Sequence, residues 1–185
     1  IVKKALALYK LARPFNALTG ALAVFLGGYL AGTGEWLNVG LAALVTLLIT
    51  GAGNSWNDCL DVEIDKINQP QRVLPSGKIS PRAAWIFSII LTVLALVIAA
   101  FINPAAFVVA LLAAIVLYIY SWKLKSTVLM GNATVAGISA LSIVFGGIAA
   151  GNIRPTLLPA AIIATAILGR EILKTLADYE GDLRQ

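Results

Sequence analysis

Long apolar segments alternate with short polar connections along the whole chain. The apolar segments are residues 15–33, 37–56, 83–102, 104–121, 128–150 and 156–177. Each approaches the roughly 20 residues that a helix needs to cross the hydrocarbon core of a bilayer. None shows the alternating pattern of a lipid-facing barrel strand. The pattern predicts an all-α, polytopic transmembrane helical bundle with six spans.

Composition supports a membrane protein and narrows its chemistry. Apolar residues make up 59% of the chain and charged residues 12%, whereas a soluble domain is usually about a quarter charged. With no histidine and one cysteine, the chain lacks the commonest transition-metal ligands. Any metal site is therefore expected to use oxygen ligands and a hard cation such as Mg²⁺. No soluble region or repeat interrupts the pattern, so residues 1–185 are predicted to form a single transmembrane domain.

Basic residues lie almost entirely on one side of the predicted bundle. Thirteen of the fourteen fall on the face that carries the N-terminus, and only Arg154 falls on the other. They are Lys3, Lys4, Lys10, Arg13, Lys66, Arg72, Lys78, Arg82, Lys123, Lys125, Arg170, Lys174 and Arg184. The positive-inside rule makes that face cytoplasmic. The net charge of +5 then suits a membrane surface or an anionic substrate, and it is no evidence for nucleic acid binding.

Acidic residues form two clusters on the same face. The first is NDCLDVEID at residues 57–65, and the second lies at the end of the sixth span with Glu171, Asp178, Glu180 and Asp182. If the second span continues as a helix, Asn57, Asp61 and Asp65 recur at i, i+4 and i+8 and share one side. Glu171, Lys174, Asp178 and Asp182 would form a similar stripe. Two facing acidic stripes predict a divalent-cation cradle, and nearby Arg and Lys predict a diphosphate bridged by the metal.

Three other interpretations fit parts of this pattern. Either acidic cluster alone is typical of a solvated, salt-bridged helix end at a membrane boundary. A divalent-cation transporter also uses intramembrane carboxylates, but it is expected to hold them near the bilayer midplane on broken helices. A structural membrane subunit needs no paired acidic motifs. The position of both clusters at helix ends on one face favours an enzyme.

Four motifs resemble the intramembrane prenyltransferases of the UbiA type. NDCLDVEID is similar to the first aspartate-rich motif of that family and DYEGD, residues 178–182, to the second. RVLPSGKIS at 72–80 and YSWKLK at 120–125 are similar to segments between them. The amino-acid sequence of these motifs is most similar to that of the archaeal branch of the family. Members of that branch form the second ether bond of archaeal membrane lipids. Family members usually have nine helices, so the resemblance implies that the chain is C-terminally incomplete.

The resemblance implies a magnesium-dependent transfer of a geranylgeranyl group at the cytoplasmic side of the cell membrane. Two Mg²⁺ ions would bridge the diphosphate of geranylgeranyl diphosphate, and the acceptor would be the hydroxyl of geranylgeranylglyceryl phosphate. The implied metal ligands are Asn57, Asp58, Asp61, Asp65, Asp178 and Asp182, with Asp61, Asp65, Asp178 and Asp182 essential for catalysis. An aromatic acceptor of the 4-hydroxybenzoate or homogentisate type stays open as an alternative. The oligomeric state is open as well.

Several further polar residues are candidates for substrate binding. Arg13 and Asn16 resemble a family position near the substrate cavity, although a capping or interfacial role fits equally. Contacts to diphosphate or to acceptor phosphate are assigned to Arg72, Lys78, Lys125 and Lys174, each of which also fits an interfacial anchor. Tyr120 could face a cationic centre with its ring or belong to the interfacial aromatic belt. Two positions depart from the family pattern: Val73, where proline is usual, and Thr175, where an acid often stands.

Overall fold

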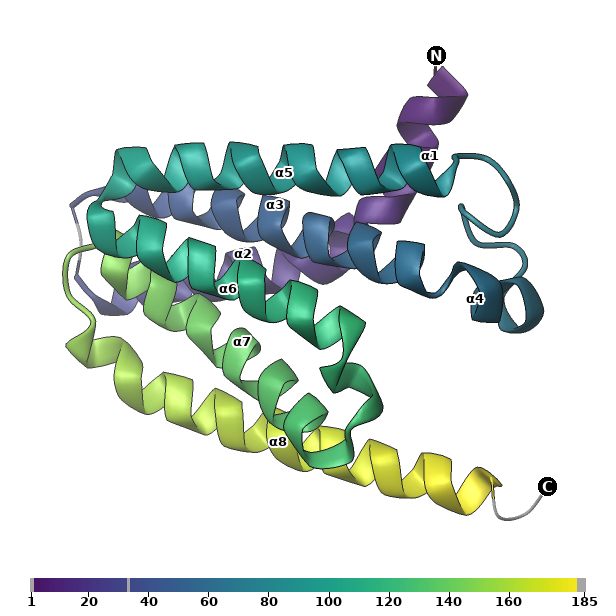
Figure 1. Ribbon diagram of the computed structural model, residues 1–185. Coiled ribbons are helices and arrows are strands. Elements are labelled where there is room, and N and C mark those ends of the chain that lie inside the picture. The colour runs from purple at the N-terminus through teal and green to yellow at the C-terminus, as the bar shows by residue number, and fades with distance from the viewer. Residues whose placement is uncertain (1, 33, 183–185) are drawn as a thin grey trace.

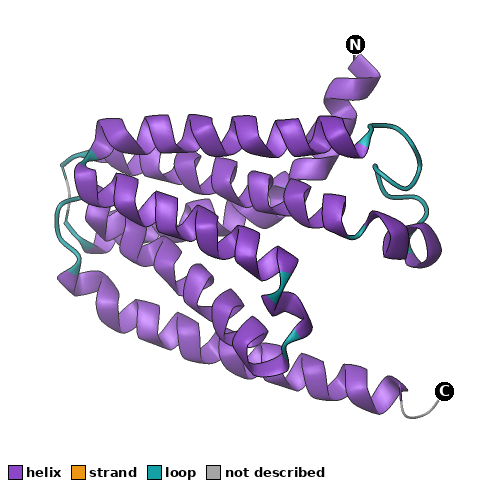
Figure 2. Ribbon diagram, viewed as in Figure 1, coloured by secondary structure: helices purple, strands orange, loops and turns teal. Residues whose placement is uncertain are grey.

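The computed structural model describes residues 2–32 and 34–182, and side chains over 4–32 and 34–176. All regular structure within these residues is helical (Figures 1 and 2). The α-helices are α1 (Val2–Ala12), α2 (Pro14–Leu30), α3 (Trp36–Leu60), α4 (Val62–Asn68), α5 (Pro81–Ile102), α6 (Pro104–Trp122), α7 (Val128–Ala149) and α8 (Arg154–Asp182), and a 3₁₀ helix, η1, covers Leu124–Ser126.

Each of the six predicted spans corresponds to one of these helices. Helices α3, α5, α6, α7 and α8 are long and apolar enough to cross a membrane, and α2 is a shorter apolar helix of 17 residues. The chain is therefore a multi-pass membrane protein. Helix α8 extends past the predicted end at residue 177, so residues 178–182 continue the helix and do not form a connection. The apolar pattern of the sequence did not predict α1 or α4 as separate helices.

Two of the spans begin at a side-chain cap followed by proline. The Ser80 hydroxyl accepts a hydrogen bond from the Ala83 amide at 3.2 Å, and the Asn103 side chain accepts one from the Ala106 amide at 2.8 Å. Each cap satisfies a backbone donor that lacks a partner within the helix. Proline fits the next position because that residue needs no amide donor. These local signals fix where α5 and α6 start.

Helix α3 lies at the centre of the bundle and packs against α1, α2, α5, α6 and α7. Helices α2 and α7 cross closely, because two glycines bring their backbones together. A Cβ atom on Gly27 would lie 2.0 Å from the Ile143 carbonyl oxygen, and one on Gly146 would lie 2.0 Å from the Val24 carbonyl oxygen. Small residues of this kind allow close helix packing inside a bilayer, where burial from water drives no association.

The connections alternate between the two ends of the bundle, as Figure 1 shows. The turns that join α2 to α3, α5 to α6 and α7 to α8 lie at one end. Helix α4, the loop before α5, η1 and the end of α8 lie at the other. The first acidic motif therefore shares its end of the bundle with the last turns of α8, as the span count predicts.

Helix α3 ends inside the first acidic motif. Leu60 is its last residue, Asp61 leaves the helical conformation, and α4 begins at Val62. The prediction of a continuous helix through Asp65 is therefore wrong. The break changes the direction of the chain after Asp61, so Asn57, Asp61 and Asp65 do not form one stripe.

Candidate active site

A cavity of about 500 Å³ opens between α2, α3, α6, α7 and α8. Its lining residues are Arg13, Asn16, Thr19, Gly20, Ala23, Thr50, Gly53, Asn54, Asn57, Leu117, Tyr120, Ser121, Ile138, Ser139, Ser142, Ile163 and Ile167. The charged and amide side chains come from the helix ends beside the acidic motif. The isoleucines lie further along α7 and α8. The cavity thus joins a polar mouth to an apolar interior, as expected of a site for an amphipathic ligand.

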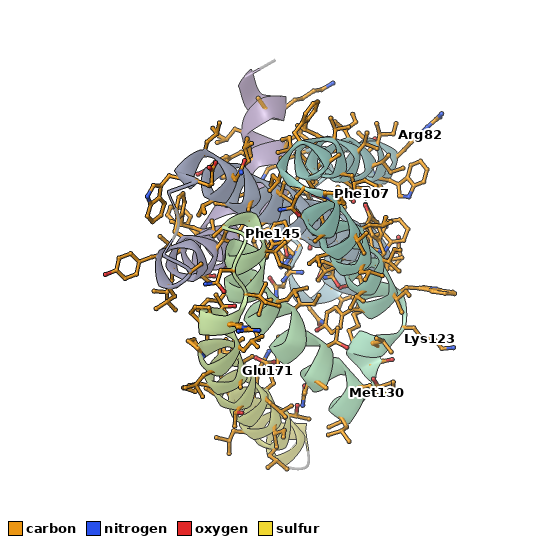
Figure 3. All side chains as sticks on the ribbon, turned by 90° about the vertical axis from the view of Figure 1, so that its left-hand side faces the viewer. Arg82, Phe107, Lys123, Met130, Phe145 and Glu171 are labelled. Carbon is orange, nitrogen blue, oxygen red and sulfur yellow. The ribbon has the colours of Figure 1, made fainter. Side chains whose placement is uncertain are left out.

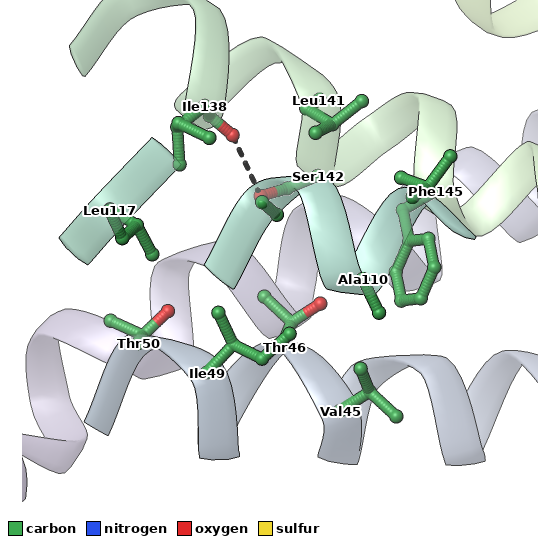
Figure 4. Close-up of a pocket in the computed structure, with 12 residues that line it drawn as sticks. Val45, Thr46, Ile49, Thr50, Ala110, Leu117, Ile138, Leu141, Ser142 and Phe145 are labelled. Atoms are coloured by element: carbon green, nitrogen blue, oxygen red, sulfur yellow. Dashed lines mark hydrogen bonds between the residues drawn. The ribbon is translucent and has the colours of Figure 1, made fainter. Parts of the chain in front are cut away.

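A smaller apolar chamber of about 50 Å³ continues from this cavity between α3, α6 and α7 (Figure 4). Thr50, Leu117, Ile138 and Ser142 line both spaces. Buried Phe145 and Val45 lie at the other end of the chamber. Since the Ser142 hydroxyl donates to the Ile138 carbonyl, it adds little polarity. The two spaces together form an apolar path into the bundle.

We call Asn57 and Asp61 the cavity pair. Both side chains contact Lys125, which lies in the connection between α6 and α7. The Asn57 amide nitrogen donates to an Asp61 carboxylate oxygen at 2.9 Å. The Lys125 ammonium forms an ion pair with the other Asp61 oxygen and lies 3.5 Å from the Asn57 side-chain oxygen. Lys125 belongs to η1, so the connection between α6 and α7 supplies this cation. Two oxygen ligands therefore already converge on one positive charge.

Asp58 and Asp65, the buried pair, contact two arginines. Their residues are 5% and 6% exposed. Arg13 forms an ion pair with Asp58, and Arg72 forms one with Asp65 at 2.7 Å while lying 4.0 Å from Asp58. Carboxylates this deeply buried need such counter-charges, because desolvation of an unpaired charge costs several kcal/mol.

The backbone at Arg13 directs this contact. Arg13 has a φ of 50°, a left-handed conformation that is rare outside glycine, and it separates α1 from Pro14 at the start of α2. Residues before proline are disfavoured in the right-handed helical region, so α1 cannot run straight into α2. The side chain of Asn54 ties the same junction to α3 by donating to the Ala12 carbonyl at 3.1 Å. Arg13 thus reaches both Asp58 and the cavity wall.

The other predicted site residues divide between the cavity and the surface. Asn16 and Tyr120 line the cavity, as the family resemblance implied for Asn16. Lys78 and Lys174 are exposed, and neither is among the residues that line the cavity. Asp178 and Asp182 lie on the final turns of α8, and their side chains fall outside the described residues.

The two departures from the family pattern have structural roles. Val73 is buried with Leu74 and Ile79 against α1, so an apolar cluster holds the loop where proline is usual. Thr175 accepts a hydrogen bond from the Asn132 amide at 3.1 Å and donates one to the Glu171 carbonyl. Its hydroxyl thereby joins α8 to α7.

The residues present fit a hard cation at the cavity pair. Among the described side chains, no three acidic or thiol groups gather as a ready metal site. The oxygens of Asn57 and Asp61 are nevertheless of the type that Mg²⁺ prefers, and the Lys125 ammonium already lies beside both. A second set of ligands would have to come from residues such as Asp178 and Asp182.

Comparisons with known proteins agree with this architecture. The family model for the UbiA prenyltransferase family matches residues 17–185. Digeranylgeranylglyceryl phosphate synthase of Methanococcus aeolicus is 40% identical over 94% of this chain and 63% of its own length. The corresponding protein of Methanococcus maripaludis is 39% identical over 97% of this chain and 65% of its own length. The chain therefore spans less than two thirds of these curated relatives.

A solved structure has the same fold. It is described as giving structural and mechanistic insights into the biosynthesis of digeranylgeranylglyceryl phosphate synthase in membranes. It matches with a TM-score of 0.90 and 34% identity, over 98% of this chain and 66% of that one. The helical bundle, the position of its acidic motif and the family match together show that the chain belongs to the UbiA prenyltransferase family.

Proposed function

We propose that this chain carries the substrate cavity of a digeranylgeranylglyceryl phosphate synthase. The reaction would transfer a geranylgeranyl group from geranylgeranyl diphosphate to the hydroxyl of geranylgeranylglyceryl phosphate. The observation that carries the proposal is the cavity pair with Lys125 at the mouth of an apolar-walled cavity. The names of the relatives from Methanococcus supply the choice of substrates. Residues 1–185 would act as one domain.

The polar mouth would bind the diphosphate and the apolar interior would bind the prenyl chain. We propose that Asn57 and Asp61, together with Asp178 and Asp182, hold Mg²⁺ ions. When bound, Mg²⁺ would neutralise negative charge on the leaving diphosphate. Asp58 and Asp65 would serve the site indirectly, because they hold Arg13 and Arg72 beside it.

The residues of the chain itself would then position the reactants. Arg13 lines the cavity and Lys125 lies beside the cavity pair, so both could donate to diphosphate oxygens. Ile138, Ile163 and Ile167 would keep water away from the allylic carbon, where positive charge develops as its bond to the diphosphate oxygen breaks. The acceptor hydroxyl oxygen would bond to that carbon. Geranylgeranylglyceryl phosphate would also bring a phosphate, which the surplus of basic side chains at this end suits.

A competition assay tests the substrate assignment. Full-length purified enzyme would receive geranylgeranyl diphosphate, Mg²⁺ and equal amounts of geranylgeranylglyceryl phosphate, 4-hydroxybenzoate and homogentisate. We expect the ether lipid as the dominant product by mass spectrometry. A prenylated aromatic as the main product would overturn the acceptor but not the prenyl transfer. EDTA should abolish turnover and added Mg²⁺ should restore it, whereas activity that resists chelation would contradict the metal proposal.

We also propose that the mouth of the cavity faces the cytoplasm, on the evidence of the basic residues at that end. Single cysteines would be placed at Asn68 and Lys123 on the proposed cytoplasmic side and at Asn152 on the other, in a Cys59→Ser background. An impermeant thiol reagent should label the first two only from the cytoplasmic side. Labelling of Asn68→Cys and Asn152→Cys from the same side would refute the proposed topology.

A further inference from the structure

Helix α1 crosses the end of the bundle at a steep angle to the spans. Figures 1 and 3 show its first turns projecting past the other helices. Helix α2, which follows it, has 17 residues and is therefore about 25 Å long, close to the roughly 30 Å thickness of the hydrocarbon core. The start of α2 at Pro14 then lies near the boundary between hydrocarbon and lipid headgroups. Because α1 ends just before Pro14 and runs sideways, it lies along this boundary.

Protein covers only one side of α1. Ala7 and Leu11 are 4% and 0% exposed, and they pack in an apolar cluster with the loop before α5. Leu6 and Tyr9 point away from this cluster and are 53% and 54% exposed. Exposed apolar side chains beside lysines are typical of a helix that lies in the membrane interface and buries its apolar side among acyl chains. The uncovered side of α1 therefore suits contact with lipid.

Four exposed basic side chains lie on α1 and around the start of α5. We call them the basic corner: Lys4, Lys10, Lys78 and Arg82. The last two lie beside α1, because their neighbours Ile79 and Ala84 share an apolar cluster with Leu11. Figure 3, which views the bundle from one end, shows Arg82 pointing sideways and away from the other helices. Trp85, one turn further along α5, is 45% exposed, as is typical of tryptophan at the level of the headgroups.

The charge of the basic corner is not balanced by the protein. Residues 1–34 and 66–170 contain no aspartate or glutamate. None of the four basic side chains forms an ion pair with another described side chain. Lys3 and Lys4 also lie in the first turn of α1, where the helix dipole favours an anion and disfavours a cation. An anion from outside the chain would relieve both effects.

We propose that α1 is an interfacial helix that binds anionic phospholipid headgroups through the basic corner. The ammonium and guanidinium groups would contact lipid phosphates, and Leu6 and Tyr9 would lie among the outermost acyl carbons. The position of α1 at the headgroup boundary favours lipid over an acidic protein as the source of the negative charge. Lipid binding of this kind does not depend on the proposed reaction.

Fluorescence quenching in nanodiscs tests this contact. The full-length protein in a Cys59→Ser background would carry a bimane label at Ala5→Cys, an exposed position of α1. The nanodiscs would contain phosphatidylcholine and a minor share of phosphatidylglycerol, with brominated acyl chains on one lipid or the other. We expect the label to report phosphatidylglycerol enriched at least about fivefold over its bulk share, which is the effect of one lysine at a membrane surface. High salt should reduce the enrichment.

Matched variants separate the basic corner from basic charge in general. Lys4→Gln and Lys10→Gln together should abolish most of the enrichment, because each lysine contributes up to about fivefold. Lys66→Gln makes the same substitution at the same end of the bundle, but Lys66 already pairs with Glu63 on α4. This variant should match the parent. A label at Asn152→Cys, at the other end of the bundle, should report the same lipid composition with and without the α1 substitutions.

Three results would refute lipid binding by the basic corner. The first is quenching of the α1 label in proportion to the bulk share of each lipid. The second is an enrichment that persists without Lys4 and Lys10 or that falls equally in Lys66→Gln. The third is a label that acrylamide quenches from water and neither lipid quenches. In that case α1 does not lie in the membrane interface, and an acidic protein becomes the candidate partner.

Discussion

The cavity pair and the buried pair come from one nine-residue motif, yet they lie in different environments. Asn57 lines the cavity, and the Asp61 side chain that it contacts is 21% exposed and meets a single lysine. Asp58 and Asp65 are nearly inaccessible and share two arginines. An accessible carboxylate can exchange its cation for a metal ion at little cost. A buried one that loses its arginine is left with an uncompensated charge. The comparison supports the proposal that the cavity pair serves binding and the buried pair serves architecture.

The largest expected effect comes from the cavity pair. Asp61→Asn keeps the size of the side chain and removes the charge that would hold Mg²⁺. We expect prenyl transfer to fall by about a thousandfold, the upper end of the effect of losing one electrostatic contact to a transition state. The unfolding midpoint in detergent should stay close to that of the parent. Near-parent turnover in this variant would contradict the proposed role of the cavity pair in metal binding.

Asp58→Asn should act mainly on stability. The substitution leaves Arg13 without its carboxylate partner in a part-buried position and also removes the charge 4.0 Å from Arg72. We expect the free energy of unfolding to fall by about 3 kcal/mol, as measured by denaturant titration in mild detergent. The second substitution Arg13→Met should restore part of the loss by removing the unpaired charge. A stable Asp58→Asn protein that has lost only metal binding would place Asp58 with the cavity pair.

Lys125→Met tests whether lysine and metal compete for the same oxygens. The ammonium of Lys125 neutralises Asp61 in the structure, so its removal should raise the affinity for Mn²⁺, used as a probe for Mg²⁺. We expect about a tenfold gain in the absence of substrate, because the competing pair is partly exposed and solvent weakens it. Titration calorimetry measures this directly. Weaker Mn²⁺ binding in the variant would mean that Lys125 organises the ligands and does not compete with the metal.

The smallest effect is expected at the surface ion pair of α4. Glu63 and Lys66 form a hydrogen-bonded ion pair at 2.7 Å, with side chains 83% and 52% exposed. Glu63→Gln should change the free energy of unfolding by less than about 0.5 kcal/mol and leave turnover unchanged. The same two assays as for Asp58 and Asp61 would measure it. A large effect on either would show that loss of any charge in the motif disturbs the site.

Much of this protein could be predicted from local sequence. The six apolar spans, the alternating connections and the common face of the acidic motifs follow from hydropathy and helix length, which depend on neighbouring residues only. Caps such as Ser80 and Asn103, each followed by proline, mark where α5 and α6 begin. Five residues predicted from the sequence as site residues also lie close together in the structure. Arg13, Asn16 and Asn57 line one cavity, and Asp61 and Lys125 contact Asn57.

The sequence could not show that the first motif separates into the cavity pair and the buried pair. A helical period places Asp65 on the same side as Asp61, but α3 ends at Leu60 and α4 takes a new direction. Arg13 reaches Asp58 because the chain bends before Pro14, a bend that depends on a single left-handed residue.

By itself, the sequence determined a six-span membrane bundle with most of its carboxylates and most of its cations at one end, because the bilayer imposes span length and charge asymmetry on any chain of this composition. Only the tertiary structure decided which cation meets which carboxylate. Those pairings join residues 45 and 64 positions apart, as in Arg13 with Asp58 and Lys125 with Asp61. Their distances depend on how α2, α3 and η1 pack, and no periodicity along the chain encodes that packing.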